Sequence, residues 1–204
     1  MKLVLATRNR HKIGEMREIL KDMEEIELLT TDQFTQLSEV EEKGSTLREN
    51  AIQKACYTAQ VSGLLSLAED TGLEVDALGG KPGVRSSRFA GENATYEQNI
   101  DKLLNLMQKI LPEDRLARFR SVVVIVKPGS SPYLVEGICE GRITAKRRGG
   151  GGFGYDPVFE VDGYGQTFAE MEQDLKNRIS HRALALAGAK DYLRKLLEEI
   201  RSSD

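Results

Sequence analysis

The chain has 204 residues, with 29 lysine and arginine residues against 32 aspartate and glutamate residues and a formal net charge of −3. Its 40% hydrophobic and 30% charged residues are typical of a folded globular protein and exclude disordered, collagenous and membrane-embedded chains. The small negative charge provides no global attraction to nucleic acid or to an acidic membrane, so any bound phosphate must be held by a local site. We expect a single domain over residues 1–204.

Cysteine usage and the N-terminus indicate the cellular compartment. Cys56 and Cys139 are far apart in the sequence, which argues against a disulfide framework or a zinc ribbon, and both are expected to be reduced core residues. The N-terminus lacks the features of a signal peptide, and no run approaches the ~20 apolar residues of a membrane span. We therefore expect a cytoplasmic protein with no membrane partner.

The first 45 residues predict a strand, a helix and a second strand. Residues 2–6 are a short apolar run, and apolar residues from Ile13 to Met23 fall on one helical face. A second short strand is expected at 26–29, followed by an acidic, irregular loop.

A capping box is expected at Thr46–Glu49, opening a helix that ends at about Ser62 with Gly63 as its stop signal. The apolar residues 64–68 then predict a buried strand. We expect that strand to end at the polar segment 69–72.

The second half of the chain begins with a Gly-, Pro- and Ser-rich segment at 79–91, which predicts a long surface loop. A second capping box at Thr95–Gln98 predicts a helix whose apolar face extends to Leu111 and which Pro112 ends.

A hairpin is expected from residues 117–127 and 133–144, and a strand-like stretch at 157–159. A last helix is expected from about Ser180 to Ile200. Helices that alternate with strands, together with a hairpin, favour an α/β fold with a mixed sheet between helical layers.

The first candidate site lies where the first strand meets the first helix, at Thr7, Arg8, Asn9, Arg10, His11 and Lys12. Free backbone N–H groups and the helix dipole favour an anion there, and Lys12 adds a positive charge. The alternative is that Thr7 and Asn9 only cap the helix and that the basic residues are solvated. The sequence contains no P-loop motif.

The second candidate is the segment Glu69-Asp70-Thr71-Gly72, where a carboxylate can bind a hard cation or accept a proton from water. Glu41 and Glu42 precede the second helix and are candidates for further metal ligands. Asn50 and Lys54 share one face of that helix, four residues apart. The alternatives are an ordinary acidic turn, a solvated loop and a solvated helix face.

The third candidate is the glycine-rich segment 149–156. Its formal match to G-x-G-x-x-G is rejected, because Tyr-Asp-Pro follows where a dinucleotide site needs a helix. The loop instead carries Phe153 and Tyr155 beside Asp156, which favours an aromatic platform for a base. The alternative is that both rings belong to the core.

The fourth candidate is Lys176 with Ser180-His181-Arg182, where cations meet a helix N-terminus. The alternative is that Ser180 is only an N-cap. The chain has two histidines, no zinc-ligand spacing and no G-x-S-x-G elbow, so neither a zinc enzyme nor a serine triad is expected.

Taken together, six motifs in order resemble the inosine triphosphate pyrophosphatase family, the non-canonical purine nucleoside triphosphate pyrophosphatases, nearly end to end. The motifs are T-x-N-x-x-K from Thr7, Glu41 ahead of E-N-A-x-x-K-A from Glu49, A-E-D-T-G-L from Ala68, L-G-G-x-P-G from Leu78, F-G-Y-D-P from Phe153 and S-H-R from Ser180. A nicotinamide oxidoreductase and a non-catalytic nucleotide- or RNA-binding module are the alternatives.

The resemblance implies hydrolysis of ITP, dITP or XTP to the nucleoside monophosphate and pyrophosphate, with Mg²⁺, in a homodimer that binds no nucleic acid. It also implies a three-layer α/β fold with a central mixed β-sheet and a deep active-site cleft. Asp70 matches the proton acceptor and, with Glu41, the metal ligands. The resemblance assigns the triphosphate to Thr7, Arg8, Asn9, Arg10, His11, Lys12 and Lys54, a substrate contact to Thr71, and the nucleoside end to Phe153, Gly154, Tyr155, Asp156, Lys176, His181 and Arg182.

One feature departs from the family pattern. Arg147 and Arg148 precede four glycines, which makes this loop longer and more basic than expected.

Overall fold

A computed structural model describes residues 1–203, without the side chain of Ser203. The chain divides into two compact units. Unit 1 comprises Met1–Asp70, Ser121–Gly137 and Arg182–Asp204, and unit 2 comprises Thr71–Arg120 and Ile138–His181. The single domain and the deep cleft remain predictions.

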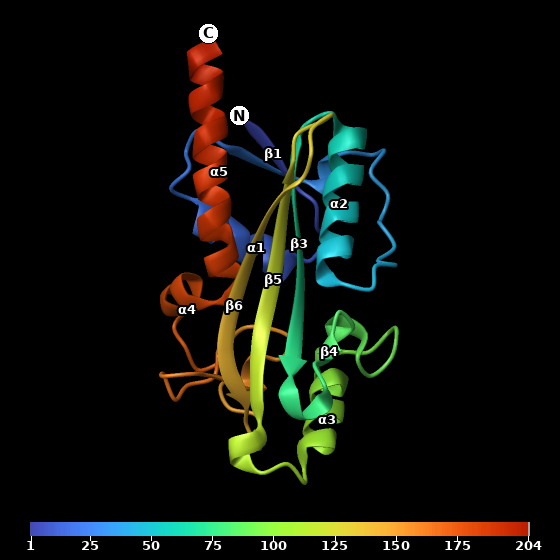
Figure 1. The fold of residues 1–204 in the computed structure, drawn as a ribbon, viewed down its shortest axis with the longest axis vertical. Coiled ribbons are helices and arrows are strands. Elements are labelled where there is room, and N and C mark those ends of the chain that lie inside the picture. Colours follow the sequence, from blue (N-terminus) through green and yellow to red (C-terminus); the bar gives the residue numbers. More distant parts are fainter. Residues whose placement is uncertain (204) are drawn as a thin grey trace. The chain divides into compact units, whose positions relative to one another are not determined.

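The strands and helices confirm the α/β class (Figure 1). The strands are β1 (Lys2–Leu5), β2 (Glu27–Thr30), β3 (Leu65–Val75), β4 (Lys81–Gly83), β5 (Leu116–Val126), β6 (Tyr133–Ile143) and β7 (Phe159–Val161). The α-helices are α1 (Arg10–Leu20), α2 (Leu47–Ser62), α3 (Tyr96–Met107), α4 (Gln173–Ile179) and α5 (His181–Ser203). The strand order is β2-β1-β3-β5-β6-β7, with β4 paired to β3. β1 is parallel to β2 and β3, whereas β4 and β7 are antiparallel to their neighbours, so the sheet is mixed as expected.

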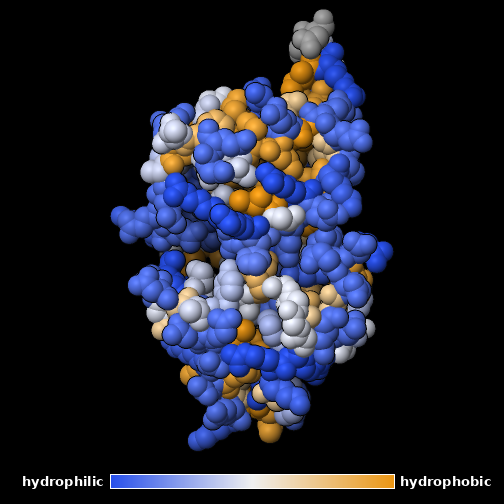
Figure 2. Space-filling view, turned by 180° about the vertical axis from the view of Figure 1, so that it is seen from behind, coloured by the Kyte–Doolittle hydropathy of each residue, from blue (hydrophilic) through white to orange (hydrophobic). Residues whose placement is uncertain are grey.

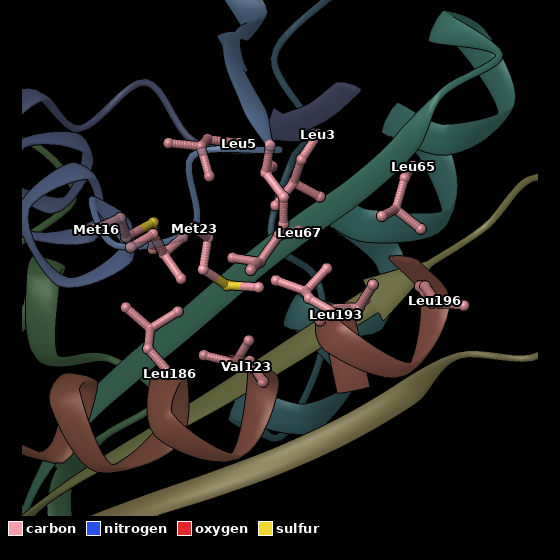
Figure 3. Close-up of a cluster of buried hydrophobic side chains, with 14 of the residues drawn as sticks. Leu3, Leu5, Met16, Met23, Leu65, Leu67, Val123, Leu186, Leu193 and Leu196 are labelled. Atoms are coloured by element: carbon pink, nitrogen blue, oxygen red, sulfur yellow. The ribbon is translucent and has the colours of Figure 1, made fainter. Parts of the chain in front are cut away.

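Unit 1 has a helical layer on each face of its strands. Leu3 and Leu5 of β1 pair in register with Leu65 and Leu67 of β3, and all four belong to one core with residues of α1 and α5 (Figure 3). Side chains alternate between the faces of a strand, so Ser66 points the other way, and its hydroxyl donates a 2.6 Å hydrogen bond to the carbonyl of Ala55 in α2. Figure 1 shows α2 and α5 on opposite sides of these strands.

The helix starts follow the sequence signals closely. The side chain of Asn9 accepts from the backbone N–H groups of His11 and Lys12 at the start of α1. Thr46 caps α2 by accepting from the N–H of Glu49, but the capping box is incomplete, because the Glu49 carboxylate accepts from the N–H and hydroxyl of Ser45 instead. Gly63 ends α2 in the left-handed conformation, as predicted.

α3 begins with the complete capping box predicted at Thr95–Gln98 but ends at Met107, four residues before Leu111. Arg115 explains the early end. Its guanidinium donates to the carbonyls of Met107 and Ile110, at 2.6 and 3.1 Å. These oxygens therefore have hydrogen-bond partners even though the helix does not continue.

The prediction that the strand after Gly63 ends at Ala68 is wrong, because β3 continues to Val75. Leu73 and Val75 are buried in the core of unit 2, and the polar side chains between them and Ala68 do not interrupt the strand. β3 therefore passes from unit 1 to unit 2 between Asp70 and Thr71.

The surface loop predicted at 79–91 contains β4 and a short 3₁₀-helix, Ser86–Arg88. Gly79 and Gly80 both have positive φ and make the tight turn that returns the chain to pair with β3. The strand-like stretch expected at 157–159 is a 3₁₀-helix over Asp156–Val158, and β7 starts at Phe159.

The predicted hairpin and last helix are confirmed as β5, β6 and α5, but α4 was not predicted. The two cysteines are free; Cys139 is buried, as predicted, whereas Cys56 is only half-buried. Burial raises the pKa of the Cys139 thiol to about 12. No helix in the described chain is long and apolar enough to cross a membrane. Figure 2 shows hydrophobic patches between hydrophilic residues, and the last turns of α5 carry both kinds of residue.

Candidate active site

Asp70 lies at the centre of the first polar cluster of unit 1. The Nζ atom of Lys54 is 3.0 Å from Oδ1 of Asp70, 2.7 Å from Oε1 of Glu42 and 3.0 Å from the carbonyl oxygen of Glu69. Asn50, one turn earlier in α2, donates from Nδ2 to Oδ2 of Asp70 at 3.2 Å. The four-residue spacing of Asn50 and Lys54 therefore directs both side chains to one carboxylate.

Burial sets the electrostatics of this cluster. It raises the pKa of the Asp70 carboxyl, and the positive charges of Lys54 and Lys12 offset part of that rise. Burial alone would lower the pKa of Lys54, but the carboxylates of Asp70 and Glu42 raise it overall. A buried carboxylate with a raised pKa beside a lysine that remains charged is suited to accept a proton.

Glu69 lies at the centre of a second cluster on the opposite face of β3. Its carboxylate is fully buried, at 0% exposure, and accepts from Ser121 Oγ at 2.6 Å and from Arg182 Nε at 3.0 Å. Lys12 Nζ lies 3.5 Å from it. Arg182 also forms an ion pair with Glu15, so two cations and two carboxylates share this buried region.

The two cations of this cluster respond differently to burial. Burial lowers the pKa of Lys12, and Glu69 opposes that effect only in part. Burial also works against the charge of Arg182, but Glu69 and Glu15 raise its pKa overall. Arg182 is therefore charged at any pH at which the protein is folded.

The segment Thr7–Lys12 combines capping with one half-buried cation. Thr7 accepts from the N–H of Asn9, which in turn caps α1. Arg8 donates to the carbonyl of Leu37 at 3.0 Å, and Arg10 and His11 are exposed. The alternative of capping thus describes Thr7 and Asn9, but Lys12 is not a solvated surface residue.

The structure brings Glu42, and not the expected Glu41, to the Asp70 cluster. The Glu41 side chain is 77% exposed and pairs with Lys43 at 2.9 Å, whereas Glu42 contacts Lys54. The sequence spacing contained no signal that separates these neighbouring carboxylates. Among residues 1–203, no group of three or more His, Cys, Asp or Glu side chains is arranged to hold a metal ion.

Unit 2 holds a third polar cluster, around Asp156. Its Oδ2 atom accepts from Lys176 Nζ at 2.6 Å and from the backbone N–H of Phe153 at 2.8 Å, and Asp156 and Lys176 are both buried. Lys176 Nζ lies 5.2 Å from the centroid of the half-buried Phe153 ring, within cation–π range. Gly152 has φ +71°, and a Cβ there would lie 2.0 Å from Asp156, so the loop requires glycine at this position.

The other predicted nucleoside residues of unit 2 are more deeply placed. Tyr155 is buried and donates from its hydroxyl to the carbonyl of Ser86 at 2.9 Å, and burial raises its pKa. His181 is buried and stacks on Phe119, with ring centroids 4.6 Å apart. Tyr155 is thus a core aromatic, as the alternative held, whereas Phe153 is not. Thr71 is half-buried in β3, and Gly154, which lies between Phe153 and Tyr155 in the sequence, has a φ of +61°.

Arg147 and Arg148 anchor the N-terminal end of the glycine loop. Arg148 binds Glu170 through two nitrogens and also pairs with Glu160. Arg147 donates to Asp101 of α3 at 2.8 Å. Arg147 and Arg148, which make this loop more basic than the family pattern, are therefore both paired with carboxylates of unit 2.

Glu15 and Ser121 are the residues of these clusters that were not identified from the sequence. Glu42 and Glu69 were identified only as possible metal ligands or proton acceptors, and Asn50 only as a neighbour of Lys54. Glu15 follows Lys12 by three residues on α1, and Asn50 precedes Lys54 by four on α2. Helical spacing was thus an available signal for both. The separation of Glu69 from Asp70 onto the opposite face was identifiable only with the knowledge that β3 continues past both residues.

The fold and these clusters define an α/β protein whose buried lysines and carboxylates suit a phosphorylated ligand. A family model described as the Ham1 family matches residues 3–192, and the chain belongs to that family. This membership confirms the resemblance found in the sequence.

Similar proteins cover almost the whole chain. A dITP/XTP pyrophosphatase of Desulforamulus reducens is 48% identical over 96% of this chain and 97% of its own length. One of Geobacter sulfurreducens is 46% identical, with coverage of 94% and 96%. The solved structure of a HAM1 protein from Coxiella burnetii has a TM-score of 0.87 at 41% identity and covers 96% of this chain and 99% of that chain.

Proposed function

We propose that this protein hydrolyses non-canonical purine nucleoside triphosphates, dITP, XTP and ITP, to the nucleoside monophosphate and pyrophosphate. Its relatives in Desulforamulus and Geobacter are named dITP/XTP pyrophosphatases and align over nearly the full chain. The observation that carries the proposal is the buried Asp70 carboxylate, with Lys54 on one oxygen and Asn50 on the other. No covalent nucleophile is needed for this chemistry.

Asp70 is the proposed proton acceptor for the water that attacks the α-phosphorus. A positioned base with a raised pKa removes the proton as the new P–O bond forms. Lys12 and Lys54, both half-buried, supply positive charge for the phosphates. Both lysines now contact carboxylates, and phosphate oxygens are alternative partners of the same charge type.

The nucleoside end is assigned to the Asp156 cluster of unit 2. Phe153 offers an aromatic face for a base, and Lys176 and Asp156 offer a donor and an acceptor. Thr71, Gly154, Tyr155, His181 and Arg182 keep the substrate contacts that the family resemblance implies. Of these, Tyr155, His181 and Arg182 have buried side chains, so Tyr155 and His181 act through the packing of their neighbours and Arg182 acts through its positive charge.

Magnesium is the proposed cofactor, and the donor chemistry fits it. Asp70 would hold the ion with Glu41, the ligand that the resemblance implies, or with Glu42, which shares Lys54 with Asp70. One or two carboxylates are enough, since Mg²⁺ completes its coordination with phosphate oxygens and water. When bound, the ion neutralises charge on the pyrophosphate leaving group.

The test is a panel of triphosphates, dITP, XTP, ITP, dGTP, GTP and ATP, incubated with Mg²⁺ and again with excess EDTA. Pyrophosphate and monophosphate from the first three, lost with EDTA, support the proposal. Orthophosphate and diphosphate as primary products contradict it. Equal rates of pyrophosphate release from all six triphosphates would contradict the selectivity for non-canonical purines but not the pyrophosphatase activity.

A homodimer is expected from the family resemblance; light scattering of the purified protein tests it, and a monomer mass contradicts it. The cytoplasm, where nucleotide pools are used, is the proposed location, and fractionation of cells tests it.

A further inference from the structure

We propose that Asn50 is a positioning residue for Asp70 and that it ties the acidic segment carrying Glu41 and Glu42 to that carboxylate. The inference rests on the proposed pyrophosphatase activity, in which Asp70 accepts the proton of the attacking water. Asn50 contacts no reacting atom and acts only through Asp70.

Asn50 joins two segments through the two ends of one amide. Its side chain is fully buried, at 0% exposure. Nδ2 donates to Oδ2 of Asp70 at 3.2 Å, and Oδ1 accepts from the backbone N–H of Gly44 at 2.8 Å. A buried amide needs hydrogen-bond partners for both its NH₂ group and its oxygen. Here these partners are Asp70, the proposed base, and Gly44, which follows the segment that carries Glu41 and Glu42.

The two oxygens of Asp70 each receive one donor. Lys54 donates to Oδ1 at 3.0 Å and Asn50 to Oδ2 at 3.2 Å, so rotation of the carboxylate about its own axis breaks both bonds. Each oxygen of Asp70 can still accept another proton or hydrogen bond, and these two donors fix the direction in which its remaining lone pairs point. Direction matters, since a displacement of about 1 Å at a reacting group can reduce a rate by about 10²-fold.

Gly44 makes the second contact possible. A Cβ atom there would lie 2.5 Å from Oδ1 of Asn50 and 2.8 Å from Cβ of Glu49, so only glycine lets the chain approach α2 this closely. Gly44 follows Lys43 directly, and Glu42 pairs with Lys54. The chain is therefore held at two points directly after Glu41: at Glu42 by Lys54 and at Gly44 by Asn50.

The experiment compares two substitutions of Asn50 with one control. Asn50→Leu has a similar volume and removes both hydrogen bonds, whereas Asn50→Asp keeps an acceptor for Gly44 and replaces the amide donor to Asp70 with a second carboxyl group. Ser66→Ala is the matched control, because it removes a different buried hydrogen bond between β3 and α2, the 2.6 Å bond to the carbonyl of Ala55.

We expect kcat for dITP to fall about 10- to 100-fold in both Asn50 variants, with KM within about 3-fold of the wild type. Ser66→Ala keeps kcat and loses only thermal stability. Hydrogen exchange adds a readout independent of activity: the Gly44 amide exchanges faster in Asn50→Leu and stays protected in Asn50→Asp.

An Asn50→Leu protein that folds and keeps its kcat overturns the inference. A rise in KM with unchanged kcat in the Asn50 variants also overturns the inference, because such a result assigns Asn50 to substrate binding. If the wild type releases no pyrophosphate, the proposed function fails instead. Crystal structures of the wild type and Asn50→Leu then decide the inference: a rotated Asp70 side chain supports it and an unchanged one overturns it.

Discussion

Glu69 and Asp70 are consecutive residues of β3, and their side chains bind two separate sets of partners on opposite faces of the strand. Glu69 contacts Lys12 and Arg182, whereas Asp70 contacts Lys54 and Asn50. The two-residue period of a strand imposes this separation. Glu69 thus binds Lys12 of α1 and Arg182 of α5 on one face of β3, and Asp70 binds Lys54 of α2 on the other face.

Asp70→Asn keeps the shape of the side chain and removes its negative charge and basic lone pair. We expect kcat to fall by roughly 10²–10⁴ when general-base action alone is lost. Steady-state kinetics and circular dichroism check this. Asp76→Asn makes the same chemical change in a surface ion pair with Arg118 and leaves kcat unchanged. Near-full activity of a folded Asp70→Asn protein would mean that the base lies elsewhere.

Glu69→Gln removes the charged partner that Lys12 and Arg182 share in a buried region, whereas the ion pair of Arg182 with Glu15 remains. Removal of one partner from a buried ion pair costs about 3–5 kcal/mol of unfolding free energy. Ser121→Ala removes only one hydrogen bond to the same carboxylate and is expected to cost about 1 kcal/mol. Urea unfolding of both variants measures the difference, and equal losses would show that the charge of Glu69 contributes nothing beyond its hydrogen bonds.

Selection of the base is predicted to depend on Arg182. A 6-oxopurine presents an acceptor at position 6 and adenine a donor, so a cationic donor favours the first. Arg182→Ala should lower kcat/KM for ITP far more than for ATP, whereas Phe153→Ala weakens both alike, because a ring stacks on either base. Using the ratio of two substrates removes the effect of any unfolded fraction that results from loss of the Arg182 ion pairs with Glu69 and Glu15. A ratio unchanged in Arg182→Ala would assign position 6 to another group.

Part of this organisation could be predicted from the sequence and part could not. Asn9, Thr46 and Thr95 were identifiable as caps because a cap depends on residues within four positions. The partners of Arg182 were not, because Glu69 and Glu15 are 113 and 167 residues away in the chain. Tertiary pairing also explains why β3 continues through two acidic residues.

Glu170 is predicted to make stability depend on acid pH. Hydrogen bonds from Arg148 and from the N–H of Thr167 lower its pKa from 4.5 to about 2. Between these values the unfolded chain binds the extra proton, so the stabilisation is complete above about pH 4.5 and is lost as the pH falls to about 2. The Tm difference between wild type and Glu170→Gln should therefore be present at pH 6 and shrink over this interval. A difference that is constant with pH would contradict the assignment.

The site of bond cleavage tests the central claim most directly. Hydrolysis of dITP in H₂¹⁸O with Mg²⁺, followed by mass spectrometry of both products, identifies the phosphorus that the water attacks. Attack at the α-phosphorus, with Asp70 as the proton acceptor, predicts one ¹⁸O atom in the nucleoside monophosphate and none in pyrophosphate. Label in pyrophosphate, or release of labelled orthophosphate, would contradict it.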